Sequence, residues 1–307
     1  MKKKPVRNLA ASVRERLRQL ARRRNEPFDL MLTKYALERL LYRLGQSDFK
    51  DRFVLKGAML FALWTDQPHR PTRDADLLGF GPSDVAGLVE IFRAVCAVVG
   101  DDGLQYPADS VRGEAHMEDK VYQGVRITMT AMLERARIPV QVDIGFGDVV
   151  TPAPEKVTYP ALLGFPAAEL RAYPMYTVVA EKFEAAVKLG GQNSRMKDFY
   201  DLWVMAQKFE FDGVTVSSAI RNTFDRRKTP LPAAAPVALP ENFVADAAKQ
   251  RQWSSFLSKS GVVAPKLPEI ARLIETFLSS PTFAAARREG FRAKWMPPGP
   301  WRDSKSG

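Results

Sequence analysis

The sequence predicts an α+β protein in which strands precede a largely helical C-terminal part. Residues 138–146 alternate apolar with polar or small side chains, which is the period of a strand with one buried face. Residues 9–20 and 30–44 instead repeat Leu or Val at helical intervals, which indicates helices with one apolar stripe. Helical spacing returns at 178–189 and 195–208. At 307 residues the chain is long enough for two domains or one elaborated domain.

The N-terminal segment is strongly basic and is predicted to form a helix. Residues 1–24 contain ten Lys or Arg against one Glu, a balance of +9 in a chain whose net charge is +11. Asn8 is the expected N-cap. The apolar stripe consists of Leu9, Val13, Leu17 and Leu20, and arginines surround it. Such a helix can dock by its leucines and offer guanidinium groups to nucleic-acid phosphates. A solvated basic helix is the alternative, and a membrane-surface helix is disfavoured because the stripe is narrow.

Apolar runs, caps and breakers predict the remaining elements in order. The first are helix Leu30–Leu44 with Asp29 as cap and Gly45 at its end, strand 53–55, a turn at Gly57, helix 58–64, loop 65–73, strand 74–80, helix 83–99 with Ser83 as cap, and loop 100–119. Next come strands 121–132 and 138–146, an irregular proline-rich segment 151–174, helices 178–189 with Thr177 as cap and 195–208, a linker 229–240, helices 241–259 and 268–278, and a disordered tail 297–307. We therefore expect three parts: a basic helical segment 1–50, a core 51–160 and a helical C-terminal domain 161–307.

Two aspartates at the start of a predicted strand are the main candidates for chemistry. Asp74 and Asp76 are two residues apart, so in a strand their carboxylates lie side by side on one face. Close carboxylates repel unless a cation lies between them, and oxygen ligands of this kind suit Mg²⁺ or Mn²⁺. Asp143 is the one acid in the alternating strand 138–146 and could point to the same region. Three carboxylates would make a site for one or two divalent ions. The alternatives are a solvated turn and a solvated strand face.

A glycine turn precedes this pair. Gly57 follows an apolar strand and opens a short apolar helix, so free backbone N–H groups and close backbone approach are expected there. A phosphate could rest on this turn while its metal is held by Asp74 and Asp76. A plain strand-to-helix turn is the alternative. Further along the chain, Arg195, Asp198 and Asp201 step by threes along a predicted helix, which on its own is typical of a surface ion-pair ladder.

Composition excludes several other classes. The single Cys96 is expected to be an inert core thiol, and two histidines with one cysteine cannot build a zinc site of Cys and His alone. No Gly-x-Gly-x-x-Gly opens a helix after a strand, which disfavours dinucleotide binding. No apolar run approaches the roughly 20 residues that span a bilayer, and no signal-peptide core follows Met1, so we expect a cytoplasmic protein.

Four ordered motifs resemble the AbiEii/AbiGii family of nucleotidyltransferase toxins, which is similar to the MenT toxins. They are Lys56-Gly57-Ala58; Arg70-x-Thr72-x-Asp74-x-Asp76; Val142-Asp143-Ile144-Gly145-Phe146-Gly147-Asp148; and Ala180–Ala185 followed by Leu189-Gly190 and Asn193–Leu202. The resemblance covers about residues 50 to 205. It implies a DNA-polymerase-β-like core, with a mixed sheet and flanking helices, and a helical C-terminal part. It also implies the toxin of a type IV toxin–antitoxin pair that limits phage by abortive infection. Such a toxin moves an NMP from an NTP to RNA, in particular to the tRNA 3′ end, and so blocks translation.

The resemblance implies roles for individual residues. The catalytic residues would be Asp74, Asp76, Lys182 and Asp198; the nucleotide-binding residues Lys56, Gly57, Ala58, Arg70, Thr72 and Lys182; the metal ligands Asp74, Asp76 and Asp143, for Mg²⁺ or Mn²⁺; and the supporting residues Arg195 and Asp201. The family often has Gly-Gly or Gly-Ser where this chain has Gly57-Ala58, so a hydroxyl contact to phosphate is missing. Our own extension is that RNA phosphates bind the basic helix, through Arg14, Arg18, Arg22, Arg23 and Arg24.

Three alternatives stay open from sequence. A kinase or a metal-dependent nuclease could use the same acids, although a nuclease would need no NTP. A degenerate core could serve as a nucleotide- or nucleic-acid-binding module, or the enzyme could be a phosphotransferase that acts on a protein. The resemblance further implies an antitoxin that acts without a stable complex.

Overall fold

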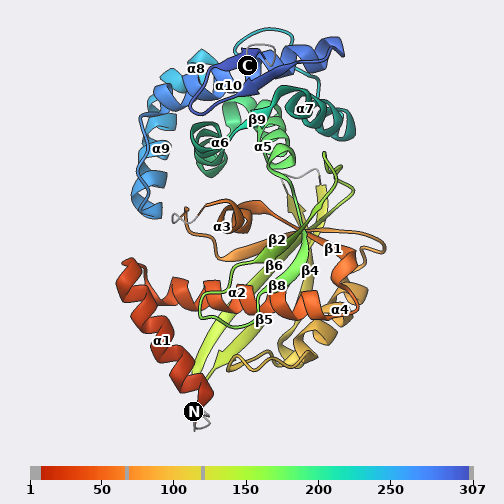
Figure 1. The fold of residues 1–307 in the computed structure, drawn as a ribbon, viewed down its shortest axis with the longest axis vertical. Helices are drawn as coiled ribbons and strands as arrows, with labels where there is room; N and C mark the ends of the chain where they lie inside the picture. The colour runs from red at the N-terminus through yellow and green to blue at the C-terminus, as the bar shows by residue number, and fades with distance from the viewer. Residues whose placement is uncertain (1–7, 66–68, 119–121, 304–307) are drawn as a thin grey trace. The chain divides into compact units, whose positions relative to one another are not determined.

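The computed structural model describes residues 8–65, 69–118 and 122–303 and divides the chain into two compact units (Figure 1). Unit 1 comprises Met1–Gly147 and Glu155–Ala172, and unit 2 comprises Asp148–Pro154 and Tyr173–Gly307. This division differs from the three predicted parts. The chain up to residue 50 belongs to unit 1 because its two helices pack on each other and on the sheet.

An eight-stranded mixed sheet forms the centre of unit 1. Its strands are β1 (Phe53–Lys56), β2 (Asp74–Gly79), β3 (Leu104–Gln105), β4 (Arg112–Glu118), β5 (Tyr122–Leu133), β6 (Ala136–Phe146), β7 (Glu155–Tyr159) and β8 (Ala168–Ala172). The order across the sheet is β3-β5-β6-β2-β1-β8-β7, with β4 also paired to β5. The pairs β2/β6 and β1/β8 are parallel and the other pairs are antiparallel. The α+β class with a mixed sheet is thus confirmed.

Helices cover the apolar face of this sheet. α1 (Leu9–Arg24), α2 (Phe28–Gln46) and α4 (Val85–Ala97) lie on this face, and the short α3 (Phe61–Trp64) contacts β7. α2 packs on β8 and β6, α4 packs on β4 and β5, and the two helices contact each other. Asn8 caps α1 as predicted, because its side-chain oxygen accepts a hydrogen bond from the backbone N–H of Ala11 at 3.0 Å.

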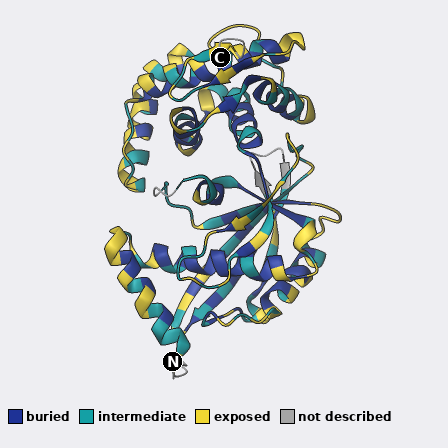
Figure 2. Cartoon of the chain, viewed as in Figure 1, coloured by how far each residue is buried: buried dark blue, intermediate teal, exposed yellow. Residues whose placement is uncertain are grey.

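The two faces of the sheet differ sharply in polarity. Buried side chains of neighbouring strands line up under the helices, and their alternation along the strands is visible in Figure 2. These buried positions are Ala75, Leu77, Val125, Ile127, Val140, Val142 and Ile144. The intervening positions are only partly buried and carry charged or polar groups. The strand period therefore presents one polar face, on which the candidate site lies.

Several predicted elements of unit 1 need correction. Asp84, not Ser83, caps α4, through the backbone N–H of Gly87, and Pro27 rather than Asp29 precedes α2. The predicted loop 100–119 contains β3 and β4. Residue 119 of this loop, residues 66–68 of the predicted loop 65–73 and residue 121 of the predicted strand 121–132 lie outside the described residues. The proline-rich segment contains β7 and β8. Its prolines lie outside these strands, so both strands can pair.

Unit 2 is built mainly from helices. They are α5 (Met175–Leu189), α6 (Met196–Lys208), α7 (Gly213–Arg227), α8 (Glu241–Ala245), α9 (Ala247–Ser260) and α10 (Leu267–Arg287). A small antiparallel sheet joins β9 (Phe211–Asp212), β10 (Ala293–Trp295) and β11 (Trp301–Asp303). The predicted disordered tail is therefore wrong as far as residue 303, because the ring of Trp301 stacks on that of Phe277 with 5.8 Å between the centroids. Residues 304–307 of the predicted tail lie outside the described residues. The helical C-terminal part is confirmed.

Thr177 does not cap its helix as predicted. It lies within α5, where its hydroxyl donates to the backbone carbonyl of Thr151.

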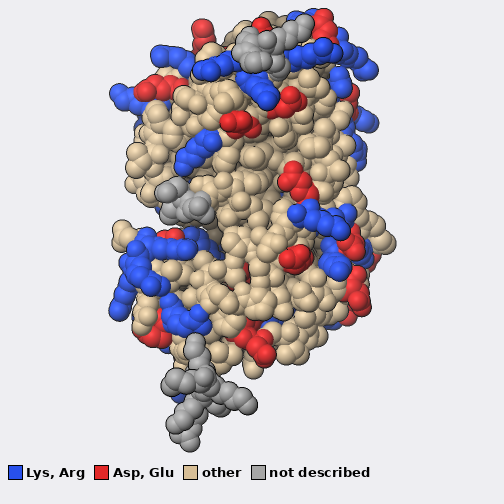
Figure 3. Space-filling model, in the orientation of Figure 1, with Lys and Arg blue, Asp and Glu red and all other residues tan. Residues whose placement is uncertain are grey.

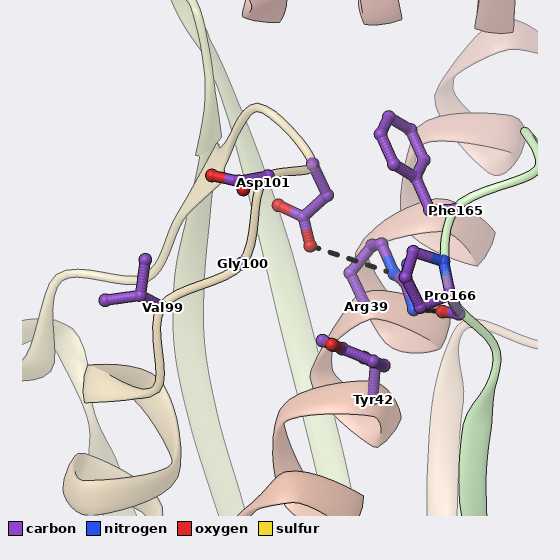
Figure 4. Close-up of a pocket in the computed structure, with 8 residues that line it drawn as sticks. Arg39, Tyr42, Val99, Gly100, Asp101, Phe165 and Pro166 are labelled. Atoms are coloured by element: carbon purple, nitrogen blue, oxygen red, sulfur yellow. Dashed lines mark hydrogen bonds and ion pairs between the residues drawn. The ribbon is translucent and has the colours of Figure 1, made fainter.

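A buried polar cluster lies between α2 and the segment that follows α4. The guanidinium of Arg43 donates two hydrogen bonds to the Asp102 carboxylate, at 2.6 and 3.0 Å, and both side chains are buried. Arg39 lies over the ring of Tyr42, with its guanidinium carbon 4.5 Å from the centroid. Arg39, Tyr42 and Phe165, drawn in Figure 4, help to line a cavity beside this cluster, and its volume is about 180 Å³. Removing one member of such a pair leaves a buried charge behind, so the cluster fixes how α2 packs.

Glu38 makes the stability of unit 1 depend on pH. Burial raises the pKa of Glu38 from 4.5 to about 7, although the backbone N–H of Leu162 donates to the carboxylate. Between about pH 4.5 and 7 the folded state therefore binds more protons than the unfolded state, so the free energy of unfolding falls as the pH rises. The full effect is on the order of 3 kcal/mol.

We expect Glu38→Gln to flatten this dependence and to make unit 1 more stable than wild type at pH 8, because the amide oxygen can still accept from Leu162. Urea unfolding at pH 5, 6, 7 and 8 measures the effect, with exposed Glu155→Gln as control. An unchanged pH profile would show that Glu38 is ionised throughout this range.

Candidate active site

A row of charged side chains crosses the polar face of the unit 1 sheet. The strand register places Lys56 of β1 opposite Asp76 of β2, Asp76 beside Asp143 of β6, and Asp143 opposite Arg126 of β5. Residues in register on paired strands point to the same face, so these four side chains lie in one line. Neighbouring strands are about 4.8 Å apart, which keeps adjacent members within reach of each other. The predicted proximity of Asp76 and Asp143 agrees with this register.

Gly57 brings the backbone directly against Asp76. It begins the 3₁₀ turn Gly57–Leu60 after β1 and has a φ of +74°, which a side chain would strain. A Cβ added to Gly57 would lie 1.9 Å from Oδ2 of Asp76. Only glycine fits here. The predicted apolar helix 58–64 is instead this 3₁₀ turn followed by the short α3, and Ala58 lies within the turn.

Asp74 and Asp76 lie on the same face of β2, one strand period apart, and both are partly exposed. The hydroxyl of Thr72 donates a 2.6 Å hydrogen bond to Oδ1 of Asp74, which orients that carboxylate. Arg70 and Thr72 belong to the same loop, as predicted, and are half-buried. Two carboxylates on one strand face beside a glycine turn fit Mg²⁺ or Mn²⁺, which usually bind one or two carboxylates plus substrate phosphates.

Asp143 is engaged by protein groups. The guanidinium of Arg126 donates from Nε to Oδ1 at 2.8 Å and from Nη2 to Oδ2 at 3.0 Å, and Gln141 Nε2 also donates to Oδ2 at 3.0 Å. Within the described ranges of the chain, no three His, Cys, Asp or Glu side chains are grouped so that they could hold a metal ion. Asp74, Asp76 and Asp143 are neighbours on one face of the sheet, and the role of Asp143 as a metal ligand stays a prediction.

Lys182, Asp198, Asp201 and Arg195 form a second cluster, in unit 2. Lys182 Nζ on α5 lies 2.6 Å from Oδ1 of Asp198 and 2.8 Å from Oδ2 of Asp201, both on α6. Arg195 Nε lies 2.7 Å from Oδ2 of Asp198. The two aspartates are buried, so this is not the surface ladder that helical spacing alone suggests. Burial would raise the pKa of Asp198, but the charges of Lys182 and Arg195 outweigh it and hold that pKa below its usual value.

Sequence reasoning missed a further ion cluster and two polar residues of the sheet. In unit 2, Arg227 of α7 pairs with Asp148, Glu181 and Glu184. Its pKa is raised because these carboxylates outweigh its desolvation by burial. In unit 1, Arg126 and His116 lie on the polar face beside Asp143. A signal existed for Arg126, which falls at a polar position in the alternation of Val125, Ile127 and Met129 along β5.

Basic side chains also gather on α1, where Figure 3 shows them on the surface. Arg14 pairs with Glu134 at 3.6 Å and Arg18 with Glu15 at 2.8 Å. The last turn of the helix carries Arg22, Arg23 and Arg24, which are all exposed. The apolar stripe faces inward, as predicted, because Val13, Leu17 and Leu20 are buried.

A mixed sheet with two adjacent aspartates against a glycine turn, followed by a helical part, is the arrangement of a nucleotidyltransferase. The family model described as "Nucleotidyl transferase AbiEii toxin, Type IV TA system" matches residues 39–288. The chain belongs to this family, and it is a nucleotidyltransferase of the toxin class. The resemblance noted in the sequence is confirmed.

Two solved structures are similar to the chain at low identity. One is a candidate nucleotidyltransferase from H. pylori, 14% identical, with 80% of this chain and 94% of that chain covered and a TM-score of 0.40. The other is JHP933 from Helicobacter pylori, 13% identical, with 84% and 97% covered and a TM-score of 0.40. Among curated proteins, none matches the sequence.

Proposed function

We propose that this toxin transfers an NMP from an NTP to an RNA acceptor in a reaction that depends on a divalent metal ion. The acceptor we propose is the 3′ end of tRNA, and loss of tRNA function would then block translation. The observation that carries the proposal is the contact between Gly57 and Asp76, where backbone and carboxylate meet with no room for a Cβ. Together with family membership, it supports a phosphate-binding turn beside a metal-binding pair.

The residues of unit 1 have separate proposed roles in binding the metal ion and the phosphates. Asp74 and Asp76 would hold Mg²⁺ or Mn²⁺, which when bound would supply positive charge to the triphosphate and lower the pKa of the attacking hydroxyl. Thr72 orients Asp74 through its 2.6 Å hydrogen bond. Gly57 and Ala58 offer the backbone of the turn to a phosphate, and Lys56, in register with Asp76, adds a positive charge to the same face. Arg70 extends from the loop before β2.

The catalytic roles of Lys182 and Asp198 stay predictions, drawn from the resemblance. Each of these residues already has a partner within unit 2 at 2.6 Å, so a structural role competes with the catalytic one. The supporting roles of Arg195 and Asp201 have the same basis, since both belong to this ion cluster. The stability and the transfer activity of Lys182→Met together separate the two roles.

Incubation of the purified chain with each of four α-³²P-labelled NTPs, Mg²⁺ and total tRNA tests the proposal. We expect label in tRNA with one or a few of the NTPs, and none when EDTA replaces Mg²⁺. Label in no RNA with any NTP would contradict the proposed reaction. Binding of nucleotide without transfer would then favour the binding-module alternative.

RNA would be held in part by α1, whose exposed arginines suit phosphate contacts. We expect the triple variant Arg22→Gln, Arg23→Gln and Arg24→Gln to weaken tRNA binding and to reduce the slope of log K against log salt by about 2, since each lost contact to single strands removes about 0.7. Arg14 and Arg18 are expected to contribute less because each has an acidic partner.

Filter binding between 50 and 300 mM KCl measures this slope. The control is a triple variant to Gln of three exposed arginines elsewhere, namely Arg251, Arg272 and Arg302. Equal slopes for the two triple variants would show that α1 has no special part in RNA binding.

An antitoxin belongs to every type IV system, so this family implies one here. We propose that it opposes the toxin without forming a stable complex with it, and that the pair acts in abortive infection. Co-expression of the two genes followed by size exclusion of the tagged toxin tests whether a stable complex forms.

In the part of the chain that the structure describes, no helix has the length and apolar character needed to cross a membrane.

A further inference from the structure

Asp143 lies beside Asp76, where it could be a third carboxylate after Asp74 and Asp76, but it accepts hydrogen bonds from Arg126. Both of its oxygens accept from Arg126, at 2.8 and 3.0 Å, and Oδ2 also accepts from Gln141. A two-pronged contact between guanidinium and carboxylate is among the stronger charge-assisted hydrogen-bond arrangements in proteins. To ligate a cation, Asp143 would have to give up part of this arrangement. Its geometry is that of a residue that holds another side chain in place.

Arg126 is held so that part of its guanidinium is available. Nε and Nη2 bond to Asp143, and Nη2 also lies 3.2 Å from His116 Nε2, which accepts in the tautomer that carries its proton on Nδ1. Nη1 has no hydrogen bond to any residue that the structure describes. The side chain is 26% exposed on the polar face. Arginine stays charged at any working pH, and its rigid fork leaves the third nitrogen pointing away from the bound carboxylate.

The position of Arg126 suits a phosphate. It lies in the same row as Asp76 and two strands away from β2, a distance of about 10 Å. Lys56 is the other cation in this row. A triphosphate carries several negative charges, so a second cation would stabilise it further. A guanidinium fixed at two nitrogens loses little freedom when the third nitrogen binds an oxygen.

We propose that Arg126 binds a phosphate group of the substrate and that Asp143 is the residue that positions it. The proposal rests on the proposed function, since it assigns a further contact within the same site. The phosphate is that of the NTP or that of the RNA acceptor, and the two sources share the chemistry that Arg126 recognises. It replaces the role of Asp143 as a third metal ligand.

Nucleotide binding without metal separates the two roles of Asp143. We would measure the affinity for a fluorescent NTP analogue in EDTA and in Mg²⁺, and the affinity for tRNA in EDTA, for wild type, Arg126→Gln, Arg126→Lys, Asp143→Asn and the double variant. Arg137→Gln is the control, since it removes an exposed arginine of β6 at the far end of the same face. Thermal unfolding of each variant shows whether unit 1 stays folded.

We expect Arg126→Gln to weaken NTP binding about tenfold in EDTA and in Mg²⁺ alike, which is the usual loss for one charged hydrogen bond. Arg126→Lys should recover part of the affinity. Asp143→Asn should have a smaller effect in both media, and the double variant should bind no worse than Arg126→Gln, because Asp143 acts through Arg126. Loss confined to tRNA binding would assign the phosphate to the acceptor.

The contrary result is equally specific. If Asp143→Asn weakens binding only in Mg²⁺ while Arg126→Gln leaves NTP and tRNA binding unchanged, Asp143 is a metal ligand and the proposal is wrong. Transfer activity in wild type together with that result would leave the proposed function intact. If wild type binds no NTP, the proposed function fails, and the tRNA measurements alone then support or overturn the role of Arg126.

Discussion

Asp76→Asn is expected to reduce nucleotide transfer by on the order of a thousandfold or more while unit 1 stays folded. The substitution keeps the shape of the side chain but removes the charge nearest the glycine turn, where Oδ2 would meet any Cβ on Gly57 at 1.9 Å. Metal and phosphate stabilisation in such sites contributes several kcal/mol, and each 1.36 kcal/mol is a factor of ten in rate. Asp74 alone would then have to hold the cation.

Transfer of α-³²P-labelled NMP to tRNA under single-turnover conditions measures the effect. Asp48→Asn is the matched control because Asp48 is an exposed aspartate in the same unit. Thermal unfolding should show little change for Asp76→Asn, since the amide keeps the shape of a side chain that is only partly buried. Full transfer activity in this variant would refute the assignment of the site.

The sequence predicts the parts of the site that depend on local pattern. The spacing of Asp74 and Asp76 in a strand places both carboxylates on one face, and the glycine after a buried strand indicates a turn. These features follow from periods of two and from the special conformations of glycine. The alternation in residues 138–146 also shows that Asp143 could point to the same region, but the pairing of β2 with β6 that places it beside Asp76 is not a local pattern.

The sequence does not specify which segments of the chain pair with one another. Arg126 bonds to Asp143 from the other strand of a hairpin, and Asp148 meets Arg227 across 79 positions of the chain. Such contacts depend on which segments pair and in what register, and the alternation within one strand does not specify its partner. β7 and β8 were missed for a related reason, since prolines between short strands resemble an irregular segment until the pairing is known.

The cluster of Lys182, Asp198, Asp201 and Arg195 was also not predictable from local spacing. Helical spacing predicts an exposed ladder of ion pairs, whereas the two aspartates are buried. Lys182→Met is therefore expected to destabilise unit 2 by about 3 to 5 kcal/mol, the usual cost of removing one member of a buried ion pair. The variant takes a cation from two carboxylates that are only 3% and 0% exposed. Urea unfolding at pH 7 measures the loss, with Lys197→Met, an exposed lysine on α6, as control.

Two further measurements separate a structural from a catalytic Lys182. If the loss comes from uncompensated carboxylates, the double variant Lys182→Met with Asp201→Asn should recover part of the stability. The difference from wild type should also shrink below about pH 4, where the carboxylates can be protonated. Wild-type stability in Lys182→Met would contradict the structural role. Loss of transfer in that stable variant would then indicate that Lys182 acts on the substrate.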